Sequence, residues 1–265
     1  MIRSDILLAP TLTRQPSTRI QICGRLAVEI AGRSITELIA RRQGRLLFIY
    51  LVVNRHRHAS RDELVEALWP DQLPPDADGA LSTLLSRLRR AIGAEALVGR
   101  GEVRLDLPAD TWVDFEAADE AIHRAESAIA QRKWAPAWGP SLVALFVARR
   151  GLLRGEDTPW IEPHRRRLED IHCSALECYT AAALGLGGGE LHVGERTARE
   201  LIARAPYRES GYRLYMEVLA ARGNIAEALR AYEELRVLLR EELGATPSPP
   251  IQALQLRLLK AADTG

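Results

Sequence analysis

The stretch of residues 80–90 combines leucines on one helical face with hydroxyls and arginines on the other. At about 100° per residue, the apolar side comprises Leu81, Leu84, Leu85, Leu88 and Ile92. The opposite side comprises Ser82, Thr83, Ser86, Arg87 and Arg90. Small hydroxyls let a helix axis approach base edges, and arginine can fork onto a guanine or a phosphate. The pattern predicts an amphipathic helix that either carries solvated arginines or lies in a DNA groove.

The segments around this helix predict a small winged helix-turn-helix domain. Strand-like alternation covers residues 19–30 and 34–38, and helices are expected at 41–54, 60–69 and 78–92. Ser60 caps the second of these helices, with Glu63 completing a capping box, and Asp78 takes the N-cap position of the third. Residues 96–107 then read as a hairpin that turns at 99–101.

After Pro108 the sequence predicts helices only, and these helices repeat. Five positions recur 34 residues later, which is the tetratricopeptide period. Gly189, Gly194, Ala198, Leu201 and Pro206 correspond to Gly223, Ala228, Tyr232, Leu235 and Arg240. Arg240 replaces the proline because the last helix of this pair is expected to run on. The glycine-rich run 185–189 is expected to form a turn between repeats.

Composition limits the possible functions but does not identify one. The 265 residues carry a net charge of +1, but the first 110 hold 16 arginines against 13 carboxylates. This local excess permits DNA binding in the first part of the chain. The three cysteines predict buried thiols rather than a disulfide framework. The N-terminus lacks a signal-peptide pattern and the apolar run 46–53 is too short to cross a bilayer, so we expect a cytoplasmic protein with no membrane partner.

Several stretches together carry a family resemblance. In the first part these are Ser-Arg-Asp-Glu-Leu-Val-Glu-Ala-Leu-Trp at 60–69, the helix 81–92, and Leu-Val-Gly-Arg-Gly at 97–101 with Arg104 and Leu105. In the second part they are residues 160–162, 206–210, 223–232 and 242–249. The first set resembles the OmpR/PhoB-type winged helix of the antibiotic regulatory protein (SARP) family. The second set resembles the bacterial transcriptional activator domain (BTAD) of that family, so that the resemblance covers roughly residues 19–262.

The resemblance implies a cytoplasmic bacterial transcription activator that binds promoter DNA, often as a homodimer on direct repeats, and recruits RNA polymerase. The implied DNA contacts are Ser82, Thr83, Ser86, Arg87 and Arg90 on the third helix, with Arg100 and Arg104 on the wing. The implied polymerase-contacting loop is Pro70, Asp71, Gln72, Leu73, Pro74, Pro75 and Asp76. The expected divisions are a flexible tail at 1–16, the winged-helix domain at 17–110 and the helical-repeat domain at 111–265.

A second hypothesis is a protein-interaction or sensory module that has lost DNA affinity and binds a partner in the helical-repeat groove. Asp78 and Glu102 favour it, because acidic side chains oppose phosphate. We expect no enzyme, no cofactor and no metal, since His56 and His58 lack further ligands nearby. Arg165, Arg166 and Arg167 are expected to form a solvated helix face with acidic partners at helical spacing. The sequence also leaves open a chain that is the front portion of a larger regulator.

Overall fold

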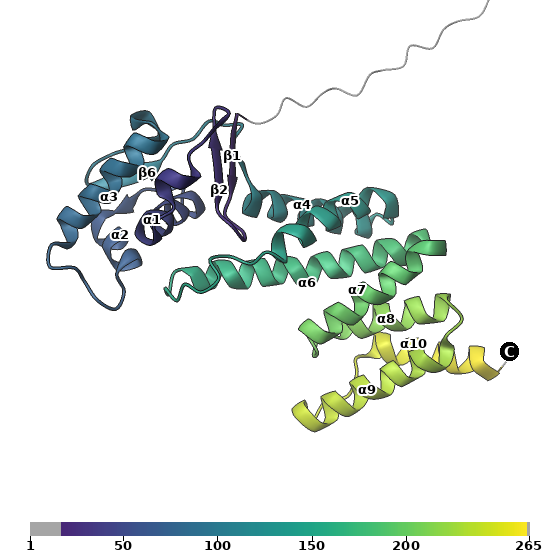
Figure 1. Ribbon diagram of the computed structural model, residues 1–265. Coiled ribbons are helices and arrows are strands. Elements are labelled where there is room, and N and C mark those ends of the chain that lie inside the picture. Colours follow the sequence, from purple (N-terminus) through teal and green to yellow (C-terminus); the bar gives the residue numbers. More distant parts are fainter. Residues whose placement is uncertain (1–16, 264–265) are drawn as a thin grey trace, which may run out of the picture. The chain divides into compact units, whose positions relative to one another are not determined.

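The computed structural model describes residues 17–263, so the expected tail at 1–16 lies outside the described residues. The chain divides into two compact units, coloured along the sequence in Figure 1. The first unit runs up to Gln21 and then from Leu26 to Val113. The second comprises Ile22–Arg25 and the chain from Asp114 onward. The backbone therefore passes between the units at three points.

A four-stranded sheet in the order β3-β2-β1-β7 opens the first unit. Its strands are β1 (Thr18–Gln21), β2 (Ala27–Ile30), β3 (Arg33–Ser34) and β7 (Trp112–Val113). The strand-like alternation expected over 19–30 forms two strands, because the chain turns between Gln21 and Ala27, with Gly24 at φ +79°, and pairs β1 antiparallel with β2. The expected strand at 34–38 is wrong beyond Ser34, since residues Thr36–Ile39 form the 3₁₀ helix η1.

Three helices follow the sheet: α1 (Arg42–Val53), α2 (Arg61–Leu68) and α3 (Ala77–Ile92). Each confirms an expected helix to within one or two residues. The buried run from Leu46 to Val52 in α1 forms the centre of the first unit's core. Ser60 caps α2 as predicted, with its hydroxyl accepting the backbone N–H of Glu63 at 3.2 Å.

The expected hairpin is also present. β5 (Leu97–Val98), which follows the short 3₁₀ helix η2 (Ala94–Ala96), pairs antiparallel with β6 (Glu102–Leu105). On its other side β6 pairs with β4 (Ala59–Ser60), which completes a three-stranded sheet. Sheet, three helices and terminal hairpin together make a winged helix, and this confirms the expected class of the first unit.

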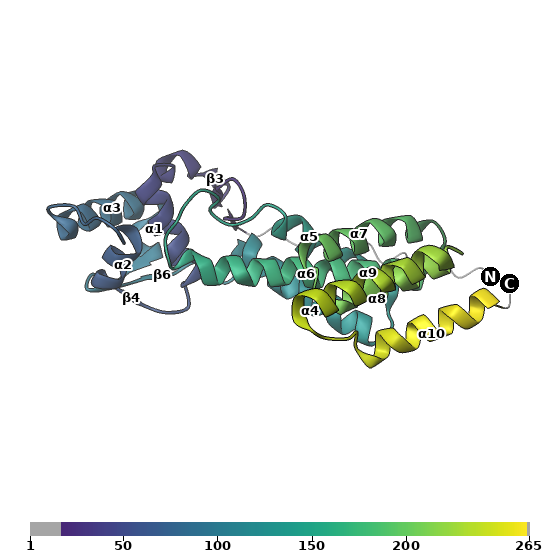
Figure 2. The same cartoon turned by 90° about the horizontal axis from the view of Figure 1, so that it is seen from below.

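The second unit is built of helices, as expected. They are α4 (Asp114–Ala130), α5 (Trp134–Ala148), α6 (Ile161–Leu186), α7 (Leu191–Arg204), α8 (Glu209–Ala221), α9 (Ile225–Leu243) and α10 (Pro249–Asp263). Consecutive helices pack against each other, and Figure 2 shows α10 beside α8 and α9. The strand β7 is the exception to the expectation of helices alone after Pro108, and it pairs in parallel with β1 in the first unit.

The 34-residue correspondence marks packing positions of the second unit. Ala198, Leu201, Ala228 and Leu235 are each fully buried. A side chain at Gly194 would meet Ala183 at 3.2 Å and Val218 at 3.3 Å, so a small residue lets α7 approach its neighbours closely. Gly187 and Gly188 both have positive φ in the turn between α6 and α7, which confirms the expected role of the glycine run.

Other expected core positions are also buried. The thiols of Cys23, Cys173 and Cys178 are free and buried, and burial raises the pKa of Cys178 to about 12. Trp138 of α5 stacks on Tyr179 of α6 with ring centroids 4.3 Å apart, which fixes these two helices together. Within residues 17–263, none of the helices combines the length and apolarity required to cross a membrane.

Candidate nucleic-acid interface

The start of α3 is set by Asp76, whose carboxylate accepts the backbone N–H of Gly79 at 2.8 Å. A Cβ at position 79 would lie 2.0 Å from Asp76 Oδ2, so this cap requires glycine there. The expectation that Asp78 caps the helix is therefore wrong. Asp78 lies in the first turn of α3 and pairs with Arg61 at the start of α2, where Arg61 Nε donates to Asp78 Oδ1 at 2.7 Å.

The apolar side of α3 docks the helix onto the first unit. Leu81, Leu85, Leu88 and Ile92 are buried, which agrees with the predicted stripe. Leu84 is only half-buried and lines a groove beside the helix. Ser82, Thr83, Ser86, Arg87 and Arg90 are all exposed. The helix thus presents the predicted polar face to its surroundings.

Two of the hydroxyls on this face already have partners. Ser82 Oγ accepts a hydrogen bond from Arg61 at 2.8 Å, while Thr83 Oγ1 donates to the Gly79 carbonyl at 2.9 Å. Arg61 was missed by sequence reasoning, because its contacts with α3 are 17 and 21 residues away in the chain. Its guanidinium neutralises Asp78 and orients the hydroxyl of Ser82 at the beginning of α3.

The arginines of this region divide into exposed and engaged ones. Arg87, Arg90 and Arg100 are exposed and form no ion pair within the described part of the chain. Arg104 is half-buried in β6 and lies 3.7 Å from Asp106. Arg89 donates to the carbonyl of Gly99 at 2.5 Å, which holds the wing turn next to the second half of α3. The structure thus brings the predicted helix and wing positions to one region.

The wing turn itself depends on a glycine. Gly99 has φ +91°, and a Cβ there would lie 1.9 Å from the carbonyl oxygen of Glu102. Only glycine allows the two strands to approach this closely. Arg100 and Gly101, which follow in the turn, are both exposed.

A polar network fixes α2 against α1. Glu63 accepts hydrogen bonds from Arg57 and from the hydroxyl of Tyr50. The Arg57 hydrogen bond is the main cause that lowers the pKa of Glu63 to about 2, so this carboxylate is ionised at any physiological pH. Burial and the bond to Glu63 raise the pKa of Tyr50 to about 12. α2, which supplies Arg61, is thereby held in place.

The predicted polymerase loop lies between α2 and α3. Its central side chain, Leu73, lies between Gln72 and Pro74 and is 61% exposed. Asp76, at the end of the predicted loop, is committed to capping α3. The loop therefore offers one large apolar side chain and is anchored at its far end.

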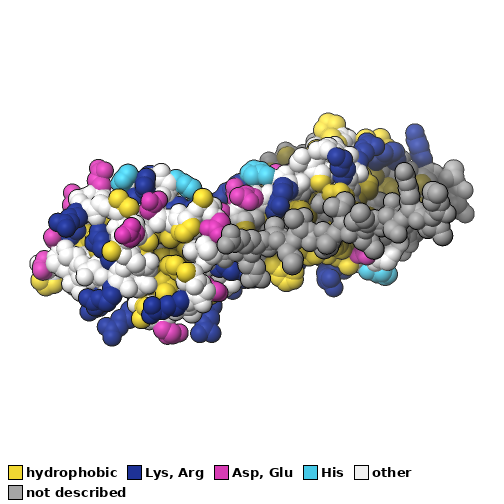
Figure 3. Space-filling model, turned by 90° about the horizontal axis from the view of Figure 1, so that it is seen from above, with side chains coloured by type: hydrophobic (Ala, Val, Ile, Leu, Met, Phe, Trp, Pro, Cys, Tyr) yellow, Lys and Arg dark blue, Asp and Glu magenta, His cyan; other side chains and the backbone are white. Residues whose placement is uncertain are grey.

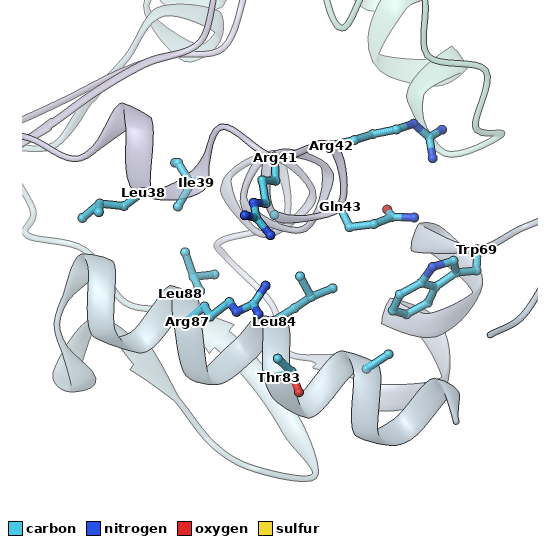
Figure 4. Close-up of a pocket in the computed structure, with 12 residues that line it drawn as sticks. Leu38, Ile39, Arg41, Arg42, Gln43, Trp69, Thr83, Leu84, Arg87 and Leu88 are labelled. Carbon is cyan, nitrogen blue, oxygen red and sulfur yellow. The ribbon is translucent and has the colours of Figure 1, made fainter. Parts of the chain in front are cut away.

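A groove with a volume of about 480 Å³ runs along α3, and its lining includes Thr83 and Arg87 of the polar face (Figure 4). Leu38, Trp69 and Leu84 provide its apolar lining, and Arg41, Arg42 and Arg87 are its charged lining residues. Among the described residues that line it there is no carboxylate. Figure 3 shows Lys and Arg side chains in dark blue spread over the first unit among acidic ones in magenta, so its charge is mixed on this face.

Comparison with known proteins identifies the family. A sequence model of the bacterial transcriptional activator domain matches residues 113–259, which is more than half of the chain. The chain therefore belongs to the bacterial transcriptional activator domain family, and the resemblance to SARP-type regulators is confirmed. Membership in this family places the chain in transcription regulation.

Individual relatives agree with this assignment. The regulatory protein AfsR of Streptomyces griseus is 31% identical over 231 residues, which covers 83% of this chain and 22% of AfsR. The regulatory protein DnrI of Streptomyces peucetius is 26% identical over 255 residues, and the match covers 92% of this chain and 92% of DnrI. The chain thus spans about a fifth of the length of AfsR and nearly all of DnrI.

A solved structure supports the fold. The structure titled "Mycobacterium tuberculosis EmbR in complex with low affinity phosphopeptide" superposes with a TM-score of 0.79 at 23% identity. The match covers 92% of this chain and 65% of EmbR. Together with the family match, it confirms the predicted class: a winged helix followed by a tetratricopeptide-like helical domain.

Proposed function

We propose that this protein is a sequence-specific DNA-binding transcription activator that recruits RNA polymerase at its target promoters. In this proposal α3 enters the major groove, where Ser82, Thr83, Ser86, Arg87 and Arg90 meet base edges and phosphates. The wing, with Arg100 and Arg104, contacts the adjacent backbone or minor groove. The relatives are named regulators, and the SARP family pattern adds a homodimer on direct repeats as the binding form.

One observation carries the proposal: the polar face of α3 is exposed and its two outward arginines form no ion pair within the described residues. Acidic residues at helical spacing would pair with solvated arginines, and α3 has none three or four positions from Arg87 or Arg90. Arg87 and Arg90 instead share their face with small hydroxyls, and Arg61 neutralises the nearby Asp78. The composition and charge of this face suit a duplex-DNA ligand.

The test is binding of the full chain to the DNA that flanks its own gene, measured by fluorescence anisotropy against a random duplex. The double variant Arg87→Ala/Arg90→Ala should weaken binding by about tenfold or more, because each arginine neutralises a phosphate or meets a base. If both contact phosphate, the slope of log K against log salt should fall by roughly 1.8. Arg166→Ala is the matched control, since Arg166 is exposed on α6 and pairs with Glu162.

Unchanged affinity in the double variant would remove α3 from the interface. Sequence specificity would be contradicted if the chain protected no specific site in a footprint and bound the flanking DNA and the random duplex with equal affinity.

Recruitment of polymerase is tested separately, through the loop. Leu73→Ser removes the exposed apolar side chain without touching the α3 cap made by Asp76. We expect unchanged promoter affinity and a several-fold loss of transcription in a purified system with RNA polymerase, because an exposed leucine is suited to burial against a protein partner. Full activation by this variant would contradict the role proposed for the loop.

The alternative is a module that binds a protein and not DNA. A groove with a volume of about 440 Å³ among α7, α8 and α9 favours it, with Arg199, Tyr215, Glu227, Arg230 and Glu234 among its lining. The acidic side chain of Asp78 supports this alternative less than the sequence indicated, because it is paired with Arg61. Binding of random duplex at low salt separates the two hypotheses: a DNA binder shows salt-dependent affinity, whereas the module shows none.

A further inference from the structure

A third cavity, of about 210 Å³, opens on the surface of the helical unit, where Arg149, Arg154 and Arg204 of its lining are exposed, and takes no part in the proposed DNA interface. It forms where the end of α5, the loop after it, the middle of α6 and the end of α7 meet. Its charged and polar lining residues are Arg149, Arg154, Arg165, Arg204, Glu169 and His172. Four guanidinium groups around one small cavity require an explanation.

Two of these arginines are compensated. Arg149 pairs with Glu200, and Arg204 donates to both carboxylate oxygens of Glu169, at 2.8 and 2.7 Å. Because Arg204 engages both oxygens of Glu169, that carboxylate adds little repulsion toward an incoming anion. The cavity therefore has two carboxylates at its margin, each already bound to its own arginine.

The other two arginines meet backbone carbonyls instead. Arg154 donates to the Arg149 carbonyl at 2.7 Å, and Arg165 donates to the carbonyls of Leu152, Leu153 and Glu156 at 3.1, 2.5 and 2.7 Å. Within the described chain neither of them has an ion pair with a carboxylate. The lining thus holds four arginines and one carboxylate, that of Glu169, and two of the arginines have no ion-pair partner within the described chain.

These contacts correct one expectation about the arginine run on α6. Arg166 pairs with Glu162 on its own helix, as expected of a solvated face. Arg165 turns toward the α5–α6 loop, and Arg167 pairs with Asp119 of α4. The run is therefore divided among three environments, of which one is the cavity.

The positions of these groups are fixed before any ligand arrives. Arg165 is held by three carbonyls of a loop in which Gly151, Leu153 and Gly155 all have positive φ. The imidazole of His172 is 2% exposed, and its Nε2 lies 3.3 Å from Glu200 Oε1. A rigid cationic cavity pays little ordering entropy when it binds an anion.

We propose that this cavity binds a phosphate group, either inorganic phosphate or the phosphate of a small ester. The carbonyl contacts use Nη2 of Arg154 and both Nε and Nη2 of Arg165, which leaves Nε and Nη1 of Arg154 and Nη1 of Arg165 to donate to the oxygens of phosphate. With a volume of about 210 Å³, the cavity accommodates a phosphate with part of its ester. Binding would join the α5–α6 loop to the end of α7 and stabilise the helical unit.

The test uses the full chain with inorganic phosphate, pyrophosphate and adenosine monophosphate as separate probes. Thermal unfolding and calorimetric titration are run at constant ionic strength, with chloride as the reference anion. Phosphate should raise Tm above the chloride value in a concentration-dependent way, because a ligand of the native state stabilises it, and the rise should be larger in the unaltered chain than in Arg154→Gln, since the nonspecific effect of phosphate is common to both. Tighter binding of adenosine monophosphate identifies an ester as the ligand, and equal binding identifies free phosphate.

The variant Arg154→Gln should weaken phosphate binding by about tenfold, since it removes one charged donor that makes a single backbone hydrogen bond. Arg166→Gln is the matched control and should bind phosphate like the unaltered chain. Circular dichroism and Tm in chloride confirm that both variants fold. Equal Tm in phosphate and chloride would overturn the proposal, as would equal phosphate affinity in Arg154→Gln and Arg166→Gln. The proposal is independent of DNA binding, which both variants should retain.

Discussion

Asp78 is an acidic side chain on the helix that DNA would approach, and its charge by itself would oppose a phosphate. Arg61 bonds to its carboxylate, to its backbone carbonyl at 3.1 Å and to the neighbouring Ser82 hydroxyl. One arginine thus compensates the acid and orients a hydroxyl on the proposed interface. At this scale the net effect of Asp78 depends on a residue 17 positions earlier in the sequence.

His172 provides a prediction for the helical unit. Burial lowers the pKa of His172 below its ordinary value of 6.5, and the charge of Arg204 lowers it further, whereas Glu200 and Glu169 act in the opposite direction. The unfolded chain therefore takes up the proton first as pH falls through about 6.5, and stability is lost. We expect a lower Tm at pH 5.5 than at pH 7.5, with a smaller difference in His172→Gln.

The exposed His192 on α7 supplies the control for this experiment, because His192→Gln removes an imidazole that is in contact with solvent. His164, whose pKa is also lowered by burial, retains part of the pH dependence in both variants. An identical pH dependence in His172→Gln and the unaltered chain would refute the role of His172.

At the scale of elements, two helical glycines predict opposite effects of the same substitution. A Cβ on Gly185 in α6 would lie 2.3 Å from the Trp134 ring of α5, whereas one on Gly139 in α5 meets nothing within 4 Å. Gly185→Ala should destabilise the protein by about 1–3 kcal/mol through overpacking. Gly139→Ala should stabilise it by about 0.5–1 kcal/mol, because alanine loses less entropy in a helix. Urea unfolding measures both, and the same sign for both variants would contradict the packing of α5 on α6.

Elements with their own periodic signal could be predicted from the sequence. The apolar residues of α2 and α3 recur at helical spacing and Ser60 marks the start of α2, while α1 follows from its long continuous apolar run. β7 could not be predicted, because it is two residues long and exists only through its parallel pairing with β1. Such a pairing joins residues more than ninety positions apart and leaves no local pattern.

The candidate site, like the fold, could be predicted from the sequence only in part. The exposed positions on α3 follow from helical geometry alone, so the sequence placed Ser82, Ser86 and Arg87 correctly on the exposed face. The Arg61 contact, the Asp76 cap and the Arg89 bond to the wing depend on tertiary structure or on the exact start of the helix. Helix ends inferred from sequence shift by one or two residues, which accounts for the distance between the expected cap at Asp78 and the observed cap at Asp76.

At the scale of the whole chain, the segment Ile22–Arg25 belongs to the second unit although both of its neighbours belong to the first. Asp114 holds it there: its fully buried carboxylate accepts the backbone N–H groups of Ile22 at 2.8 Å and of Cys23 at 3.1 Å. The backbone of Cys23 also forms an isolated antiparallel β-bridge with Leu152, and the backbone N–H of Gly24 donates to the Gly151 carbonyl at 2.7 Å. This segment therefore links the end of β1 to the helical unit by backbone contacts.

Asp114→Ala should destabilise the chain by about 2–4 kcal/mol, because it leaves two buried N–H groups without an acceptor, each costing roughly 1–3 kcal/mol. Asp119→Ala is the control on the same helix and should cost about 1 kcal/mol or less, since Asp119 is 37% exposed and forms surface ion pairs. Urea unfolding gives the two free energies. Trypsin gives a local readout at the exposed Arg25, which should be cleaved faster in Asp114→Ala because its segment has lost an anchor. If cleavage at Arg25 and the unfolding free energy both match those of the unaltered chain, the segment is held by other contacts, and Asp114 is not what fastens it to the helical unit.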